Sequence, residues 1–304
     1  MPKWDRNRVV SLLLQAGRIA LDQYGHAAGK FKRDRTIVTE ADKAVESFLT
    51  EELENTAEDS FLIGEETCAE KSAAYLDEAL FRSSSAWIVD PIDGTAMYAA
   101  GIPLWGVSIG YAEHGVIREG GIYMPCTGEL LISGDGAAWY AEIRPGGMDF
   151  PDFRQLDRPQ QHLSGNSAIA LSQLAARRIV NRIPCQQLCL GSAVAATMYF
   201  ATGRIAGMIH RAKLWDHAGA IPPLRNLGAT AKFSDGHDLM DGVISDASYE
   251  LDYESMYAFR LRETITFGAS EEIRAQLAEK WRIVPEEEFE KLFQQPQNNE
   301  GKAT

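Results

Sequence analysis

The sequence has few cysteines, and no two of them are separated by only two residues. Its four cysteines, Cys68, Cys126, Cys185 and Cys189, are scattered along the chain. A zinc site built on cysteine normally needs closely spaced pairs. We therefore expect buried free thiols and no zinc centre. Cys185 and Cys189 lie in an apolar, strand-like run, which favours burial over a functional role.

Long apolar runs are also missing. No segment approaches the roughly 20 apolar residues that a membrane helix needs. The first residues, Met1 to Asp5, contain no apolar core of a signal peptide. The sequence also has no internal repeat and no low-complexity segment. These features predict a cytoplasmic protein that has no membrane partner.

An excess of positive charge is the third absence. The chain has 30 Lys and Arg residues against 43 Asp and Glu residues, which gives a net charge of −13. Binding to a nucleic-acid backbone needs a basic face, so nucleic acid is excluded as a partner. A small phosphorylated metabolite is compatible with this charge, because metal ions or helix N-termini can supply local positive charge.

The remaining composition is that of a globular protein with a large core. The chain has 304 residues, of which 45% are hydrophobic, enough for one large domain or two moderate ones. We predict an N-terminal half over 1–145, a C-terminal half over 165–290 and a polar tail over 291–304. The loop 144–164, which contains Gly146 and Gly147, separates the halves, and the two halves are expected to form one compact catalytic unit.

Apolar periodicity predicts a mixed α/β chain. In the first half, apolar residues alternate between turn signals from 103 to 140, which indicates an antiparallel meander. In the second half, strands and helices alternate. Six helices are predicted with both bounds, over 5–24, 72–81, 96–100, 172–182, 216–226 and 270–281. One more is predicted to begin at residue 40, and another to begin after Gly191 and Ser192 and to end near residue 201. The predicted strands are 61–63, 87–89, 104–111, 116–123, 130–133, 137–140, 168–171, 187–190, 205–209, 230–233 and 263–267.

The segment from Trp87 to Thr95 carries the strongest chemical signal. An apolar run ends at Val89 and is followed by Asp90, Pro91, Ile92, Asp93, Gly94 and Thr95. This pattern predicts a buried strand that stops and a helix that starts, with two acids at the junction. Two carboxylates so close together repel each other unless a positive charge lies between them, and a divalent cation is the simplest source of that charge.

Other acids occupy similar positions. Glu65 follows the predicted strand 61–63, Asp216 begins a predicted helix, and Asp42 lies in the first turn of another. Each one alone is explained by surface charge or by the helix dipole. Together with Asp90 and Asp93, however, they form a set of hard oxygen ligands without a histidine cluster, which favours magnesium over zinc.

The spacing of these motifs resembles that of the inositol monophosphatase family, a group of magnesium-dependent, lithium-sensitive sugar phosphatases. The resemblance rests on Gly64-Glu65-Glu66, on Asp90 to Thr95, and on Trp215-Asp216-His217-Ala218-Gly219-Ala220. The segment from Ile37 to Asp42 also resembles a family segment. The resemblance covers most of the chain and implies a layered αβαβα sandwich that commonly forms a homodimer.

The resemblance also implies roles for individual residues. Asp42 and Thr95 would orient and activate the attacking water, with Glu65 beside them, and the backbone N–H groups of Gly94 and Thr95 would bind phosphate. Gly191 and Ser192 would line the substrate side. Two magnesium ions, with a third weaker ion near Glu65, would be held by Glu65, Asp90 and the carbonyl of Ile92, and by Asp90, Asp93 and Asp216.

The sequence departs from the family pattern in several places. Animal inositol monophosphatases carry a substrate-contacting acid seven residues before the aspartate of the last motif, and here that residue is Ile209, followed by His210 and Arg211. The loss of this acid leaves room for a substrate with additional anionic groups. Alternatively, Arg211 and Lys213 are solvated surface charges. The family's usual Asn-Phe pair after Thr95 is also missing. His217 occupies a commonly apolar position of the family, where we expect a local hydrogen-bonding role and no part in catalysis.

The predicted function is hydrolysis of a small phosphomonoester by a metal-activated water. Inositol phosphates, fructose 1,6-bisphosphate, histidinol phosphate and 3′-phosphoadenosine 5′-phosphate are all candidate substrates. A non-catalytic binding or regulatory protein of the same family is the alternative class. Such a protein would be expected to lack one residue of the catalytic set, and this sequence retains Asp42, Glu65, Asp90, Asp93, Thr95 and Asp216.

Overall fold

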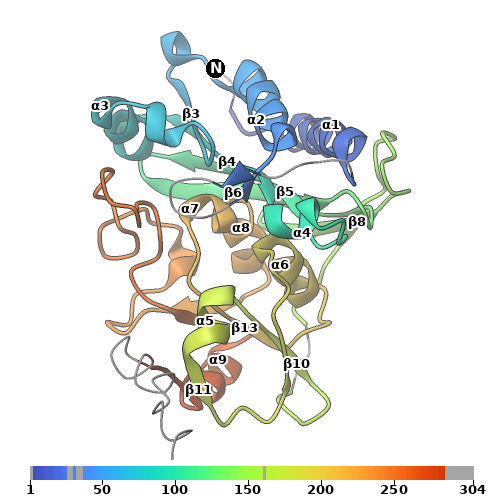
Figure 1. The fold of residues 1–304 in the computed structure, drawn as a ribbon, viewed down its shortest axis with the longest axis vertical. Coiled ribbons are helices and arrows are strands. Elements are labelled where there is room, and N and C mark those ends of the chain that lie inside the picture. Colours follow the sequence, from blue (N-terminus) through green and yellow to red (C-terminus); the bar gives the residue numbers. More distant parts are fainter. Residues whose placement is uncertain (1–2, 26–29, 32–36, 160–161, 285–304) are drawn as a thin grey trace, which may run out of the picture.

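The computed structural model describes residues 3–25, 30–31, 37–159 and 162–284. The predicted tail over 291–304 lies outside these residues, as does the end of the predicted C-terminal half. Helices and sheets stack in alternating layers, which Figure 1 shows from top to bottom. The predicted mixed α/β class and the layered sandwich are therefore confirmed.

The first sheet has seven strands in the order β3-β4-β5-β6-β7-β8-β9. Only β3 and β4 are parallel, and every later pair is antiparallel, so the predicted meander is confirmed. The strands are β3 (Ser60–Gly64), β4 (Ser85–Asp93), β5 (Gly106–Glu113), β6 (Val116–Met124), β7 (Glu129–Gly134), β8 (Ala137–Glu142) and β9 (Arg154–Gln155).

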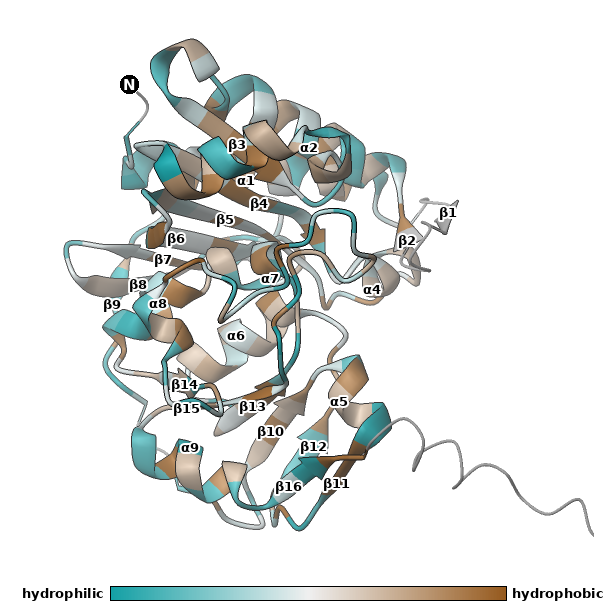
Figure 2. Ribbon diagram, turned by 90° about the vertical axis from the view of Figure 1, so that its left-hand side faces the viewer, coloured by the Kyte–Doolittle hydropathy of each residue, from teal (hydrophilic) through white to brown (hydrophobic). Residues whose placement is uncertain are grey.

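Helices α1 (Arg6–Gln23) and α2 (Glu40–Leu53) cover one face of this sheet (Figure 2). Their apolar residues recur at helical spacing and are buried against the inward-facing residues of β4, β5 and β6. A short pair of strands, β1 (Lys30–Phe31) and β2 (Ile37–Val38), precedes α2. The buried face of α2 holds Val45, Leu49 and Leu53, as its periodicity predicts.

The other face of the seven-stranded sheet packs on α6 (Ala193–Ala201), α7 (Leu214–Ala218) and α8 (Ile221–Asn226). Beneath these helices lies a second sheet with the order β12-β10-β13-β15-β14. Helices α5 (Gln173–Arg178) and α9 (Glu271–Ala278) pack on that sheet (Figure 1). Its strands are β10 (Ala168–Leu171), β12 (Gln186–Leu188), β13 (Gly207–His210), β14 (Thr230–Lys232) and β15 (Ile265–Gly268).

Several predicted elements differ from the observed ones. The strand expected to stop at Val89 continues to Asp93. The helix predicted over 72–81 is a short α3 (Ala73–Asp77) followed by a π-helical turn over Glu78–Arg82. The helix predicted over 172–182 ends at Arg178, because β11 (Ile179–Asn181) pairs with β16 (Trp281–Ile283). The helix predicted over 216–226 is two helices, α7 and α8.

The predicted burial of the cysteines is only half right. Cys68 and Cys185 are buried, Cys126 is half-buried, and Cys189 is exposed. Cys189 directly follows β12, which is the edge strand of its sheet and whose three residues are exposed. The run around Cys189 therefore predicts the strand correctly, but it does not predict that the strand is exposed at the sheet edge.

The described helices are also informative about membranes. None of them combines the length and the apolar character needed to span a bilayer. The longest is α1, and its outward face is polar.

Candidate active site

Parallel pairing of β3 with β4 places the first two acids side by side. Gly64 pairs with Val89 in this register, and the Glu65 N–H donates to the Val89 carbonyl at 3.3 Å. Glu65 and Asp90 are therefore the next residues at the same edge of the sheet. The carboxyl ends of parallel strands are where ligands gather in such folds.

An irregularity in β4 then changes the direction of the chain. Asp90 pairs with Ser108 and Asp93 with Gly106, so two residues of β4, Pro91 and Ile92, face a single residue of β5. Proline is tolerated at a bulge because it has no N–H to contribute to the sheet. The bulge carries the strand on to Asp93, where it turns into α4 (Thr95–Ala99).

Gly94 makes that turn possible. Its φ is +86°, and a Cβ there would lie 2.9 Å from the Leu104 carbonyl oxygen and 2.9 Å from the Ser192 Cβ. The glycine is thus required by its backbone conformation and by close packing against the start of α6. The sequence predicted a role for Gly94 but not this contact.

The third acid, Asp216, lies on α7, and this helix packs very close to the seven-stranded sheet. A Cβ on Gly110 would lie only 2.5 Å from the Ala218 Cβ, and one on Gly120 would lie 2.7 Å from the Gly219 carbonyl oxygen. The Ser108 hydroxyl donates to the Trp215 carbonyl at 3.1 Å and accepts from the Gly219 N–H at 3.3 Å. Because Ser108 pairs with Asp90, this anchor fixes α7 beside the strand that carries Asp90.

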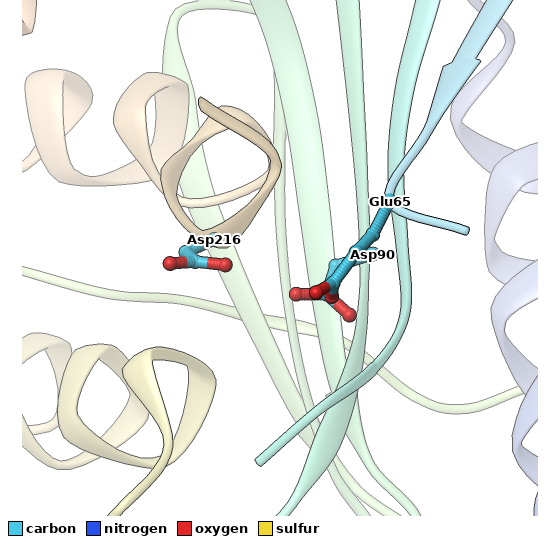
Figure 3. A group of neighbouring side chains, drawn as sticks. All are labelled: Glu65, Asp90 and Asp216. Carbon is cyan, nitrogen blue, oxygen red and sulfur yellow. The ribbon is translucent and has the colours of Figure 1, made fainter. Parts of the chain in front are cut away.

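Glu65, Asp90 and Asp216 consequently form one cluster. A carboxylate oxygen from each lies within 4.8 Å of the other two, and Figure 3 shows Asp216 facing Glu65 and Asp90 from the first turn of α7. Burial, followed by the negative charges of Glu65, Asp93 and Asp216, raises the pKa of Asp90 well above its usual range. Burial and the charges of Asp93 and Glu65 likewise raise the pKa of Asp216.

The donor set of this cluster suits a hard divalent cation. Asp90 is 1% exposed, and its Oδ1 has no hydrogen-bond partner within the described part of the chain. A buried carboxylate oxygen without a donor is costly unless a cation or water satisfies it. Crowded oxygen ligands without cysteine or histidine fit magnesium or calcium.

Asp93 lies beside this cluster but has a different set of contacts. Its carboxylate accepts hydrogen bonds from the Ala193 N–H at 3.1 Å, the Val194 N–H at 2.7 Å and the Ser192 hydroxyl. It therefore caps the N-terminus of α6. Burial raises the pKa of Asp93 to about 6, and these three hydrogen bonds offset part of that rise.

The structure brings Asp42 and Thr95 together just after the end of β4. Asp42 is fully buried and forms a capping box with Thr39, whose N–H donates to Asp42 Oδ2 at 2.7 Å. The Thr95 hydroxyl lies 3.3 Å from Asp42 Oδ1 and 3.0 Å from the Ile92 carbonyl oxygen. A threonine hydroxyl held in this way sits between a carboxylate and a backbone carbonyl, next to the acidic cluster.

Glu46 is a residue of this region that sequence reasoning missed. It is 1% exposed, one helical turn after Asp42, and accepts from the Glu66 N–H and the Thr67 N–H, both at 2.8 Å. A Cβ on Gly64 would overlap the Glu46 carboxylate. Glu46 thereby fixes the turn that presents Glu65. Its only sequence signal is an acid on the apolar face of a predicted helix.

A cavity of about 620 Å³ opens onto the acidic cluster. Glu65, Asp90, Asp93, Thr95 and Asp216 line one part of it. The predicted substrate residues Gly191, Ser192, His210 and Arg211 line the same cavity, together with Arg177, Lys213 and Arg260. A volume of this size is typical of small-molecule sites.

His217 does not join the acidic cluster. It is 1% exposed and packs against the rings of His210 and Phe267, with centroid distances of 5.9 Å and 5.4 Å. Its Nε2 has no partner among the residues described. Burial lowers the pKa of His217 to about 3 and that of His210 to about 4, so both rings are neutral near pH 7.

Carboxylates gathered from two neighbouring strands and a helix of a layered α/β sandwich form a site suited to a divalent cation, and comparisons with known proteins identify the family. The sequence profile of the inositol monophosphatase family matches residues 7–280. The chain therefore belongs to this family, and the resemblance noted in the motifs is confirmed.

Two relatives illustrate the range of the family. A histidinol-phosphatase of Chlorobaculum parvum is 33% identical over 143 residues, which are 46% of this chain and 52% of that protein. An inositol-1-monophosphatase of Mesorhizobium japonicum is 28% identical over 77% of this chain and 88% of that protein. The match to the histidinol-phosphatase, and that to a fructose-1,6-bisphosphatase/inositol-1-monophosphatase of Thermotoga maritima, each span only about half of the relative's length.

A solved structure confirms the architecture. The extragenic suppressor protein suhB of Bartonella henselae superimposes with a TM-score of 0.65 at 23% identity, and the match covers 90% of this chain and 96% of that one. At this identity the similarity establishes the fold alone.

Proposed function

We propose that this protein is a magnesium-dependent phosphatase that hydrolyses a small phosphomonoester by attack of a metal-activated water. The observation that carries the proposal is the meeting of three acids at the wall of one cavity: Glu65 from the turn after β3, Asp90 from β4 and Asp216 from α7. Membership of the inositol monophosphatase family supports it.

The acids and one carbonyl form the proposed magnesium sites. Glu65, Asp90 and the Ile92 carbonyl would hold one ion, and Asp90, Asp93 and Asp216 a second, with Asp90 shared between them. A third, weaker ion would lie near Glu65. Bound magnesium supplies positive charge against phosphate oxygens and lowers the pKa of water. The unpartnered Oδ1 of Asp90 supports this assignment.

Asp42 and Thr95 would act on the attacking water. The Asp42 carboxylate is locked by Thr39 and holds the Thr95 hydroxyl at 3.3 Å. The Thr95 hydroxyl can accept a hydrogen bond from the attacking water while it donates its own hydrogen to the Asp42 carboxylate. The pair thereby orients the nucleophile and can take up its proton. The backbone N–H groups of Gly94 and Thr95 would bind the phosphate, and the chain's main contribution is to position the groups.

The leaving alcohol would face Gly191, Ser192, His210 and Arg211, which line the rest of the cavity. Inositol phosphate, fructose 1,6-bisphosphate, histidinol phosphate and 3′-phosphoadenosine 5′-phosphate stand as candidate substrates. The similarity to a histidinol-phosphatase keeps that substrate in the set. A non-catalytic family member is disfavoured by the retention of all six proposed catalytic and metal-binding side chains.

A phosphate-release screen over these compounds tests the proposal. We expect release that depends on magnesium, is abolished by a chelator and is inhibited by lithium. No release from any compound, at saturating magnesium and with folded protein, would contradict a catalytic role. The homodimer, the cytoplasmic location and the domain division around residues 145–165 stay predictions of the sequence.

A further inference from the structure

The cavity that holds the acidic cluster is also lined by basic residues. Four cations line it, although the whole chain has a net charge of −13. They are Arg177 on α5, Arg211 and Lys213 after β13, and Arg260 in a later loop. The charge of Lys213 partly offsets the burial and repulsion that raise the pKa of Asp216, so we count Lys213 with the acidic cluster. The other three are arginines.

Backbone pairing forces two of these cationic segments together. The Leu214 N–H donates to the Phe259 carbonyl at 2.8 Å, and the Leu261 N–H donates to the Ala212 carbonyl at 2.9 Å. Lys213 consequently stands directly opposite Arg260 in an antiparallel bridge. Like charges directly opposite each other destabilise a pairing. Each side chain lies over an aromatic ring, Lys213 over Trp215 at 5.2 Å and Arg260 over Tyr257 at 5.0 Å, so the fold accommodates two cations beside the cavity.

Arg211 is fixed in the same wall. Its Nε donates to the Leu261 carbonyl at 2.9 Å, and half-burial with the neighbouring charges of Arg260 and Arg178 lowers its pKa. Within the described residues, no carboxylate forms an ion pair with Arg177, Arg211 or Arg260. A crowded group of guanidinium ions favours binding of an anion.

Resting on the proposed function, we propose that the substrate is a phosphomonoester whose alcohol portion carries a second anionic group. Arg211 and Arg260 hold that group, a phosphate or a carboxylate, while the phosphate to be released lies at the acidic cluster. Guanidinium groups present paired donors that match both anions. An alcohol with an ammonium group, such as histidinol phosphate, would be repelled by the same wall.

Arg177 gives weaker support to the proposal than Arg211 and Arg260 do. It is exposed and lies in the last turn of α5, where a positive charge is already favoured by the helix dipole. Arg211 and Arg260 lie outside the described helices, so the helix dipole does not explain them, although Arg260 also lies over the Tyr257 ring at 5.0 Å. Ile209 in β13 is fully buried, so it contributes no carboxylate to the cavity that could bind a hydroxyl or an ammonium group.

Matched substrate pairs test the proposal. Glucose 1,6-bisphosphate differs from glucose 6-phosphate by one phosphate, and 3-phosphoglycerate differs from glycerol 3-phosphate by a carboxylate in place of a hydroxymethyl group. We expect kcat/KM with magnesium to be at least about tenfold higher for the member of a pair with the added anion, as one charge-assisted hydrogen bond allows. The pair with the larger ratio tells which anion is recognised.

Variants then locate the site. In Arg211→Gln and Arg260→Gln the preference ratio should fall by roughly 10- to 100-fold, mostly through KM. Arg211→Lys should keep part of it, because the charge remains while the paired donors are lost. Arg82→Gln is the matched control, since Arg82 is an exposed residue paired with Glu78 on the surface. Thermal unfolding of each variant checks that the fold is retained.

Three outcomes separate the possibilities. A preference for the anionic member that collapses in either arginine variant, and not in Arg82→Gln, supports the proposal. Equal or better hydrolysis of the neutral compounds or of histidinol phosphate overturns it while leaving the phosphatase assignment intact. No phosphate release from any compound, including p-nitrophenyl phosphate, would overturn the proposed function itself.

Discussion

Glu46 shows how a residue outside the acidic cluster can control the geometry within it. Its two carboxylate oxygens accept the N–H groups of Glu66 and Thr67, so the turn that follows β3 has one conformation. Glu65 is the first residue of that turn. Partners that orient a metal ligand are often worth 10- to 100-fold in metal affinity.

Replacing Glu46 with glutamine should weaken magnesium binding without unfolding the protein. A glutamine offers one carbonyl and one amide NH₂ to two N–H donors, so one donor is left without an acceptor. We expect the magnesium concentration for half-maximal activity to rise about tenfold, measured by magnesium titration of phosphate release. Glu51→Gln, on the exposed side of the same helix, should change nothing, and an unchanged titration for Glu46→Gln would refute this role.

The predictability of the site differs from residue to residue. Glu65, Asp90, Asp93 and Asp216 can be predicted because each follows an apolar run or lies at the start of a predicted helix, and both are local features of the sequence. Glu46 and Ser108 do not, because their partners lie 20 and 107 residues away. Their importance depends on which strands pair, and no local pattern in the sequence contains that information.

At the scale of elements, the approach of α7 to the sheet decides whether the acids meet. Gly110 on β5 and Gly120 on β6 leave room for the backbone around Ala218 and Gly219. With side chains at these positions, α7 would stand farther from β4 and Asp216 would move away from Asp90. Close packing of this kind is sensitive to a single added methyl group.

Gly110→Ala should therefore damage both stability and metal binding. The added Cβ would lie 2.5 Å from the Ala218 Cβ, and overpacking of this type costs about 1–3 kcal/mol of unfolding free energy. Urea unfolding and magnesium titration measure the two effects. Gly165→Ala is the control, because its nearest neighbour would be 3.9 Å away. Wild-type magnesium affinity in Gly110→Ala would contradict the proposed packing constraint.

The elements themselves are predicted best where periodicity is strong. The meander from β5 to β8 and helices α1 and α2 are close to their expected bounds. The sequence fails where tertiary pairing overrides local preference. Helix α5 gives way to β11 because Ile179 to Asn181 pair with β16, far along the chain. The strand β4 passes through Pro91 because the bulge against β5 accommodates it.

At the scale of the whole molecule, repulsion among the clustered carboxylates lowers the stability of the fold when no metal ion is bound. The chain is strongly acidic, and several of its buried carboxylates are crowded around one site. Burial and mutual repulsion raise the pKa values of Asp90, Asp93 and Asp216. A cation that binds only the folded state relieves this repulsion and stabilises the fold.

Magnesium should consequently raise the unfolding temperature. At a concentration of 100 times the dissociation constant, the expected gain is about 2.7 kcal/mol of unfolding free energy. Thermal unfolding with magnesium chloride is compared with sodium chloride at equal ionic strength, because salt alone screens the net charge. An equal shift in both salts would mean that screening, and not site binding, causes the effect.

The most direct test compares phosphate release by the wild-type protein, Asp90→Asn and Asp22→Asn, using the most rapidly hydrolysed compound at saturating magnesium. Asp22 is an exposed residue of α1 that pairs with Arg18, so Asp22→Asn controls for the loss of a carboxylate. We predict wild-type turnover for Asp22→Asn and no detectable turnover for Asp90→Asn. Asp90→Asn should remain folded without magnesium, because it removes a buried repulsion. Near-normal, magnesium-dependent turnover in Asp90→Asn would contradict a catalytic site built on Glu65, Asp90 and Asp216.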